Sequence, residues 1–209
     1  MSLFRIAPAA FLVACAAAPV TLAAPPSPPD DAHLISEEGV GPLKGIAQAQ
    51  DDAQTEARIA ALLASDRTLE VQFDVMDVGI EEEAEEGYFS VVDPALRTEE
   101  SMGEVLQIFR DDPLTIRVLS DRYATRDGLR VGVKVKDVLA KRPDLTCARE
   151  SRALSLMTCT SPSEPAITYV IAAKKSDGAK PKPVIAPKTL ASRKVAVIVH
   201  ARQTDSPWR

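Results

Sequence analysis

The chain has 209 residues, a formal net charge of −5 and only 4% aromatic residues. This length suits one domain with an aliphatic core, and the negative charge argues against nucleic acid as a partner. The charge is unevenly divided, because residues 1–112 carry 6 Lys/Arg and 22 Asp/Glu, whereas residues 113–209 carry 19 and 8. Either the halves offer an acidic and a basic surface to partners, or they pack together and partly neutralise each other.

The first residues are typical of a secretory signal, with Arg5 before an apolar stretch over 6–13 that is too short to span a bilayer. Two processing sites compete. Leu12-Val13-Ala14-Cys15 matches a lipobox, in which residues 1–14 are removed and Cys15 is lipidated. Alternatively, residues 1–23 are removed by ordinary secretion. Both predict export to the cell envelope, on the periplasmic side, with a Pro-rich tether over 24–33.

The first half of the chain predicts one helix and then strands. Apolar residues at helical spacing predict a helix over 51–65. Alternating apolar and polar residues predict the strands that follow. The acidic run 81–86 reads as a solvated hairpin tip between two of them. The predicted strands cover 69–75, 88–92, 105–110 and 114–118.

The second half repeats this order. A glycine-marked turn over 125–132 precedes a short helix within 133–142 that Pro143 stops. Strands are predicted over 153–159, 166–172 and 194–201, with an exposed loop over 174–188 and a flexible tail over 204–209. The expected fold is α+β, a single domain over 34–203. It comprises an antiparallel sheet of six to eight strands, two helices on one face and an αβββ pseudo-repeat.

The alternating apolar positions predict the core. His200 alternates with Val195, Val197 and Val199, so we expect its side chain on the exposed, polar face of the last strand. The expected core residues are Leu69, Val71, Phe73, Ile116, Val118, Leu156, Ile167, Tyr169, Val195 and Val197.

No motif for catalysis, a metal or a cofactor is recognisable. Neither His33 nor His200 forms part of a recognisable arrangement of nucleophile, base and partner acid in the sequence. Cys147, Cys159 and His200 lack metal-ligand spacing. The acidic run lacks the pattern of a calcium loop. Because Cys15 is either lipidated or removed, two cysteines remain, and in an exported protein they predict a Cys147–Cys159 disulfide.

Membrane contact is the functional candidate that charge supports. The exposed loop contains five lysines in a stretch of fifteen residues. Lysines close to anionic lipid headgroups are attracted to them. The alternative is that the loop only keeps the protein soluble. The lysines are Lys174, Lys175, Lys180, Lys182 and Lys188.

Three stretches resemble a family of Gram-negative envelope lipoproteins of unknown function, the one named for an RpoE-regulated lipoprotein. They are Ile35-Ser36 with Gly39-Val40-Gly41-Pro42-Leu43, then Thr125-Arg126-Asp127-Gly128-Leu129-Arg130-Val131-Gly132, and then Cys147, Cys159 and Ile167-Thr168-Tyr169-Val170. The resemblance implies a lipid anchor at Cys15 and no known activity. The turn and short helix over 128–142 are also similar in layout to binding modules of outer-membrane assembly lipoproteins.

The sequence therefore predicts an exported, lipid-anchored domain that is not an enzyme and binds or supports structure at the membrane–periplasm boundary. The alternative is a periplasmic module that binds a partner protein of the envelope, as an enzyme inhibitor or an outer-membrane assembly factor.

Overall fold

The computed structural model describes residues 29–45, 52–76, 86–109, 114–149, 156–172 and 185–201. Several predicted features lie outside these ranges, namely the leading segment with Cys15, acidic residues 81–85, Lys174, Lys175, Lys180, Lys182 and the tail 204–209. Among the described residues, no helix has the length and apolar character needed to cross a membrane.

Two α-helices, four short 3-10 helices and eleven strands make up the regular structure of these ranges. The first half contains β1 (Leu34–Ser36), β2 (Gly39–Val40), α1 (Asp52–Ser65), β3 (Glu70–Met76), β4 (Glu86–Val92), β5 (Glu104–Phe109) and β6 (Thr115–Val118). The second half contains β7 (Ala124–Thr125), α2 (Val135–Lys141), β8 (Thr146–Ala148), β9 (Leu156–Ser161), β10 (Glu164–Ala172) and β11 (Val195–Ala201).

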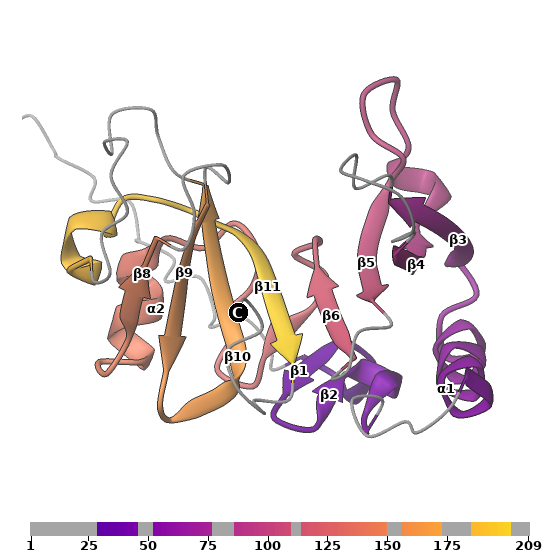
Figure 1. Cartoon of the computed structure of the whole chain (residues 1–209), viewed down its shortest axis with the longest axis horizontal. Coiled ribbons are helices and arrows are strands. Elements are labelled where there is room, and N and C mark those ends of the chain that lie inside the picture. The colour runs from indigo at the N-terminus through magenta and orange to yellow at the C-terminus, as the bar shows by residue number, and fades with distance from the viewer. Residues whose placement is uncertain are drawn as a thin grey trace, which may run out of the picture.

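The strands form one large antiparallel sheet of eight strands, in the order β3-β4-β5-β6-β11-β10-β9-β8. Each half therefore contributes one helix and a four-strand meander, and the meanders meet at the β6–β11 pair. This confirms the predicted fold class and the pseudo-repeat in layout, with four strands per half instead of three. A small sheet, β2-β1-β7, joins the two halves through the parallel pairing of β1 with β7. Figure 1 shows α1 beside the β3 end of the large sheet and α2 beside the β8 end.

One face of the large sheet carries the core. Ile116, Ile167 and Ile108 are each no more than 1% exposed and lie on this face. Both helices and the small sheet contribute to the same cluster, through Leu62 of α1, Val138 of α2 and Ile35 of β1, among others. Both helices therefore pack against this core. Burial of these aliphatic side chains at about 25 cal/mol per Å² is the main stabilising term of the domain.

Six of the ten predicted core residues are buried, namely Leu69, Ile116, Val118, Ile167, Tyr169 and Val195. Val71 and Val197 are half-buried. Phe73 is 53% exposed and Leu156 39% exposed, so these two predictions are wrong. Phe73 lies on the edge strand β3, where its ring packs on Phe89 and over Gly87. In β9, Met157 and Cys159 face the core, which places Leu156 on the opposite face.

The predicted position of His200 is also wrong, because its side chain is 2% exposed. A β-bulge in β11 explains the difference. Val170 pairs with Val197 but Ile171 pairs with Val195, so Ala196 is an extra residue. The bulge reverses the alternation, and His200 pairs with Ile167 and Ile116 on the core face.

One ion-pair cluster joins the acidic and basic halves. Arg122 Nη1 lies 3.0 Å from Asp66 Oδ2, and Arg122 Nη2 lies 2.7 Å from Asp93 Oδ2. Asp66 follows α1 and Asp93 follows β4, so an arginine of the basic half neutralises two carboxylates of the acidic half. Packing between the halves thus accounts for part of the charge asymmetry.

Candidate functional site

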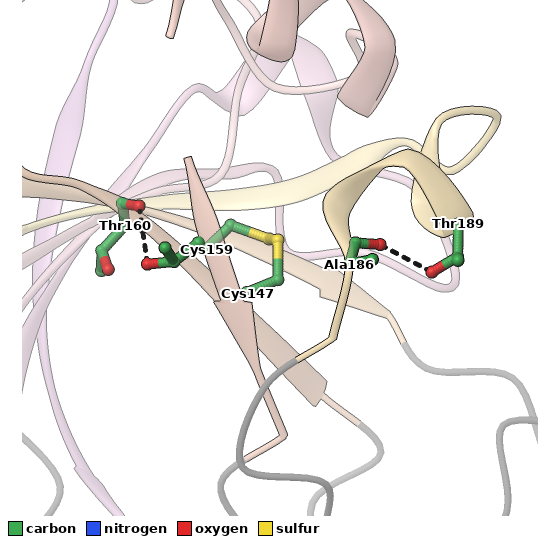
Figure 2. Close-up of a disulfide and its surroundings, with 6 residues drawn as sticks. Cys147, Cys159, Thr160, Ala186 and Thr189 are labelled. Carbon is green, nitrogen blue, oxygen red and sulfur yellow. Dashed lines mark hydrogen bonds between the residues drawn. A yellow bond between two sulfur atoms is a disulfide. The ribbon is translucent and has the colours of Figure 1, made fainter. Parts of the chain in front are cut away.

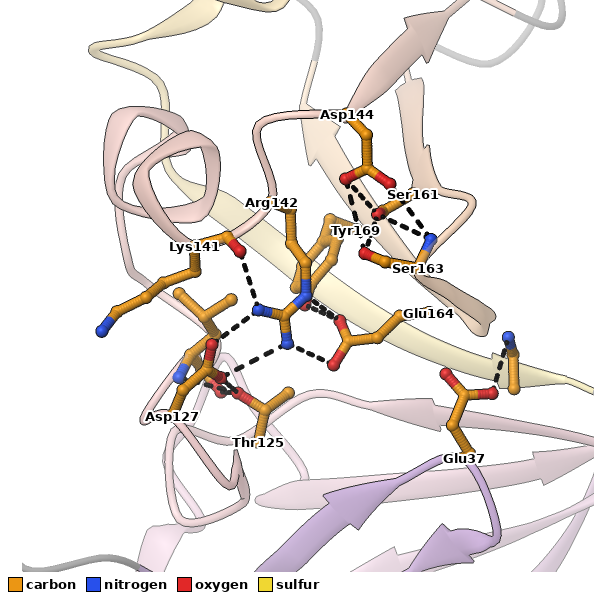
Figure 3. Close-up of polar contacts among 12 residues, drawn as sticks. Glu37, Thr125, Asp127, Lys141, Arg142, Asp144, Ser161, Ser163, Glu164 and Tyr169 are labelled. Carbon is orange, nitrogen blue, oxygen red and sulfur yellow. Dashed lines mark hydrogen bonds and ion pairs between the residues drawn. The ribbon is translucent and has the colours of Figure 1, made fainter.

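A cluster of polar side chains lies where the small sheet packs against the core face of the large sheet. We call it the polar junction, and its members are Glu37, Thr125, Asp127, Arg142, Glu164, Tyr169 and His200. The β1–β2 turn supplies Glu37, the turn after β7 supplies Asp127, and β10 supplies Glu164 and Tyr169. Figure 3 shows Arg142 between the side chains of Asp127 and Glu164.

Arg142 is the centre of the polar junction. It follows the last residue of α2, and its side chain is 14% exposed. Nη1 donates to Asp127 Oδ2 at 2.6 Å, and Nε donates to Glu164 Oε2 at 2.6 Å. Nη2 pairs with Glu164 Oε1, which makes the contact with Glu164 bidentate. Such paired, charge-assisted hydrogen bonds are among the strongest that side chains form.

Neutral side chains orient the two carboxylates. Thr125 Oγ1 donates to Asp127 Oδ1 at 2.6 Å and accepts from the backbone N–H of Leu129 at 2.9 Å. Gly128 lies between them with a φ of +86°, which L side chains rarely adopt. On the other side, the Tyr169 hydroxyl donates to Glu164 Oε2 at 3.0 Å. The turn after β7 and strand β10 are thereby fixed on either side of Arg142.

Charge and burial shift the pKa values in this cluster. Hydrogen bonding to Glu164 outweighs burial and raises the pKa of Arg142. Burial opposes ionisation of Asp127, yet hydrogen bonds from Thr125 and Arg142 prevail and lower its pKa. Burial raises the pKa of Tyr169. Perturbed pKa values occur in structural ion-pair networks as well as in active sites, and here the shifted groups are bonded to one another.

Glu37 and His200 tie the β1–β2 turn to the large sheet. Glu37 Oε2 accepts from the backbone N–H of Ala166 at 3.4 Å. Its backbone oxygen lies 3.2 Å from His200 Nε2, which assigns the ring proton to that nitrogen. His200 Nδ1 is buried and has no hydrogen-bond partner among the described residues. Burial, with the neighbouring charge of Glu164, raises the pKa of Glu37.

Burial lowers the pKa of His200 below its ordinary value of 6.5. The folded state therefore disfavours protonation, and the unfolded state binds more protons as the pH falls below about 6.5. By linkage, His200 contributes stability that is present above pH 6.5 and lost below it, with a slope of up to about 1.4 kcal/mol per pH unit. Urea denaturation of wild type and His200→Gln as a function of pH should show this slope only in the wild type. Equal slopes in the two proteins would contradict the assignment.

A second polar group closes the β9–β10 hairpin. Ser161 Oγ donates to Asp144 Oδ1 at 2.6 Å and lies 2.7 Å from Ser163 Oγ. The backbone N–H of Ser163 also donates to Asp144, at 3.1 Å. This arrangement resembles the side-chain bonds that stabilise turns, and it lowers the pKa of Asp144 through the bond from Ser161. His200 is not part of this group, because its ring contacts the backbone of the β1–β2 turn.

The structure contains the predicted disulfide. Cys147 of β8 and Cys159 of β9 are directly opposed, with their Cα atoms 4.0 Å apart, and both are buried. Figure 2 shows the bond between the two strands, with Ala186 and Thr189 in its surroundings. The backbone N–H of Ile185 donates to the Cys147 oxygen at 2.7 Å, so the disulfide also secures the chain just before Ala186.

Of the predicted membrane-contact lysines, Lys188 is described and is exposed, in the 3-10 helix η6 (Pro187–Leu190). Within the described ranges, no three His, Cys, Asp or Glu residues are grouped as metal ligands. No pattern in the sequence predicted a role for Glu37, Arg142 or Glu164. The one signal that could have found Arg142 is its position before Pro143, at a helix end, together with the Asp-Gly turn fifteen residues earlier.

Comparison with known proteins finds a solved structure with a similar fold. No family model matches the chain, and no curated protein matches it. The structure is similar to the crystal structure of the uncharacterized protein yfeY from Escherichia coli, with a TM-score of 0.51 and 17% sequence identity. The match covers 81% of this chain and 99% of that chain. At this identity the similarity shows a common fold.

Proposed function

We propose that this chain is an exported cell-envelope lipoprotein, anchored through Cys15, whose domain binds partners or supports structure and is not an enzyme. The observation that carries the proposal is the Cys147–Cys159 disulfide between neighbouring strands. Disulfides persist in oxidising compartments such as the periplasm, which agrees with the secretory leading segment. The resemblance to the RpoE-regulated lipoprotein family supports the anchor, and with it a role in the envelope-stress response.

The side chains of the polar junction are engaged in contacts within the domain. A catalytic residue needs free reach to a substrate, whereas Arg142, Asp127 and Glu164 bond to one another. The same bonds hold the small sheet and α2 against the large sheet. We therefore assign the polar junction to the integrity of the domain.

A second candidate is a module that binds an envelope protein, as an inhibitor or an assembly factor does. It is favoured by β3, a seven-residue strand at the edge of the large sheet. Edge strands can accept an extended segment of another chain, and the exposed ring of Phe73 lies on this strand.

Fractionation tests the anchor. Wild type should sediment with membranes, and Cys15→Ser should move to the soluble periplasmic fraction, because two or more acyl chains are needed for stable anchoring. As the matched control, Cys147→Ser/Cys159→Ser removes the other two cysteines and should stay with the membranes. A soluble wild type that begins at Ala24 or Pro25 would show ordinary secretion and contradict the anchor.

A further inference from the structure

Four exposed lysines gather where α2 meets η6 (Pro187–Leu190) and the start of β11, a region we call the basic end. They are Lys134, Lys136, Lys188 and Lys194. The backbone N–H of Lys136 donates to Ala191 at 3.1 Å, and Lys134 and Lys194 are paired by an isolated β-bridge. Lysines separated by some fifty residues in sequence are thus adjacent, and three of them were not part of the lysine-rich loop.

These lysines lie where positive charge is electrostatically unfavourable. Like charges directly across a β-bridge are destabilising, and Lys134 faces Lys194. Lys134 is also the N-cap of α2, where it makes no side-chain capping bond, and Lys136 follows in the first turn. Cations are unfavourable at this positive end of a helix. The one acidic residue of that turn is Asp137.

The opposite end of the molecule is acidic. β3, β4 and β5 belong to the half of the chain with 6 Lys/Arg and 22 Asp/Glu, and exposed Glu70, Glu99 and Glu100 lie on or near them. The α2 and β8 end belongs to the half with 19 Lys/Arg and 8 Asp/Glu. Figure 1 places α1 and α2 near opposite ends of the large sheet. The domain therefore has a charge polarity along its length that would orient it at a charged surface.

We propose that the basic end docks on anionic phospholipid headgroups, a surface that offsets the repulsion among its lysines. This inference deepens the proposed function and rests on it. An anchor at Cys15 leaves the domain free to reach the membrane surface. Cys15 and Asp30 are fifteen positions apart, a length of chain that spans at most about 50 Å. That length exceeds the radius of gyration of about 16 Å expected for such a domain. The domain can thus lie with its basic end on the membrane that holds its lipid, and its acidic end faces away.

Vesicle sedimentation tests the docking separately from the anchor, because it uses the full chain with Cys15→Ser. This protein should bind vesicles of phosphatidylcholine mixed with phosphatidylglycerol, and should not bind phosphatidylcholine alone. Lys134→Gln/Lys194→Gln should weaken binding about 25-fold, at roughly fivefold per lysine. Arg58→Gln/Arg67→Gln removes two exposed cations of the acidic half and should leave binding unchanged. Salt that shortens the Debye length from about 10 Å to about 3 Å should abolish binding.

A capping variant separates docking from a structural role. Lys134→Ser introduces a favourable N-cap, so it should raise the melting temperature while it weakens vesicle binding about fivefold. Equal binding to neutral and anionic vesicles would overturn the proposal, as would absence of binding to both. Unchanged binding of Lys134→Gln/Lys194→Gln would overturn it too, whether or not Cys15 proves to be lipidated.

Discussion

Replacing Arg142 with alanine should lower the free energy of unfolding by about 3–5 kcal/mol, the loss typical of a buried ion pair with one partner removed. The side chains of Arg142, Glu164 and Asp127 are 14%, 16% and 28% exposed. Without Arg142 these two partly buried carboxylates lose their shared cation, and Glu164 also lies close enough to Glu37 to repel it. Urea denaturation at neutral pH measures the loss.

Two further variants show whether the loss arises from stranded charge. Lys141→Ala removes the exposed neighbouring cation and should change stability by no more than about 0.5 kcal/mol. Adding Glu164→Gln to Arg142→Ala should recover part of the loss, because it removes one uncompensated carboxylate. If Arg142→Ala costs no more than Lys141→Ala, the polar junction does not hold the domain together.

The regular elements were the part of the fold that local sequence could predict. The helix expected over 51–65 is α1 (Asp52–Ser65), and the strand expected over 105–110 is β5 (Glu104–Phe109). The apolar periodicities of helices and strands are set by residues close together in the sequence, so they can be recognised without knowledge of the fold. The repetition of one helix and a meander was visible for the same reason.

The small sheet and the polar junction could not be found in this way. Strands β2 and β7 have two residues each, too few for any periodicity. Arg142 reaches Glu164 across 22 residues, and His200 reaches Glu37 across 163. These contacts depend on tertiary packing. The bulge at Ala196 is a single-residue event that reversed the faces of β11, and nothing in Val195 to His200 marks it.

Removing the disulfide should cost about 3 kcal/mol, the chain-entropy value for a loop of this size. Cys147 and Cys159 are 12 positions apart in the sequence. The bond ties β8, a three-residue strand at the edge of the sheet, to β9. Cys147→Ala/Cys159→Ala should therefore unfold at lower urea than the oxidised wild type. The loss should be largest locally, because Ile185 depends on Cys147 for its backbone hydrogen bond, so its amide should exchange faster with deuterium.

Reduction provides the matched comparison. Dithiothreitol should lower the stability of wild type toward that of Cys147→Ala/Cys159→Ala and leave the double variant unchanged, since only the wild type holds a bond to reduce. Thiol labelling of the denatured, unreduced protein after its leading segment is processed should find no free cysteine, because Cys147 and Cys159 are joined and Cys15 is either lipidated or removed. Two labelled thiols per chain would show that the bond is absent in the exported protein. That result would also remove the observation on which the proposed envelope location rests.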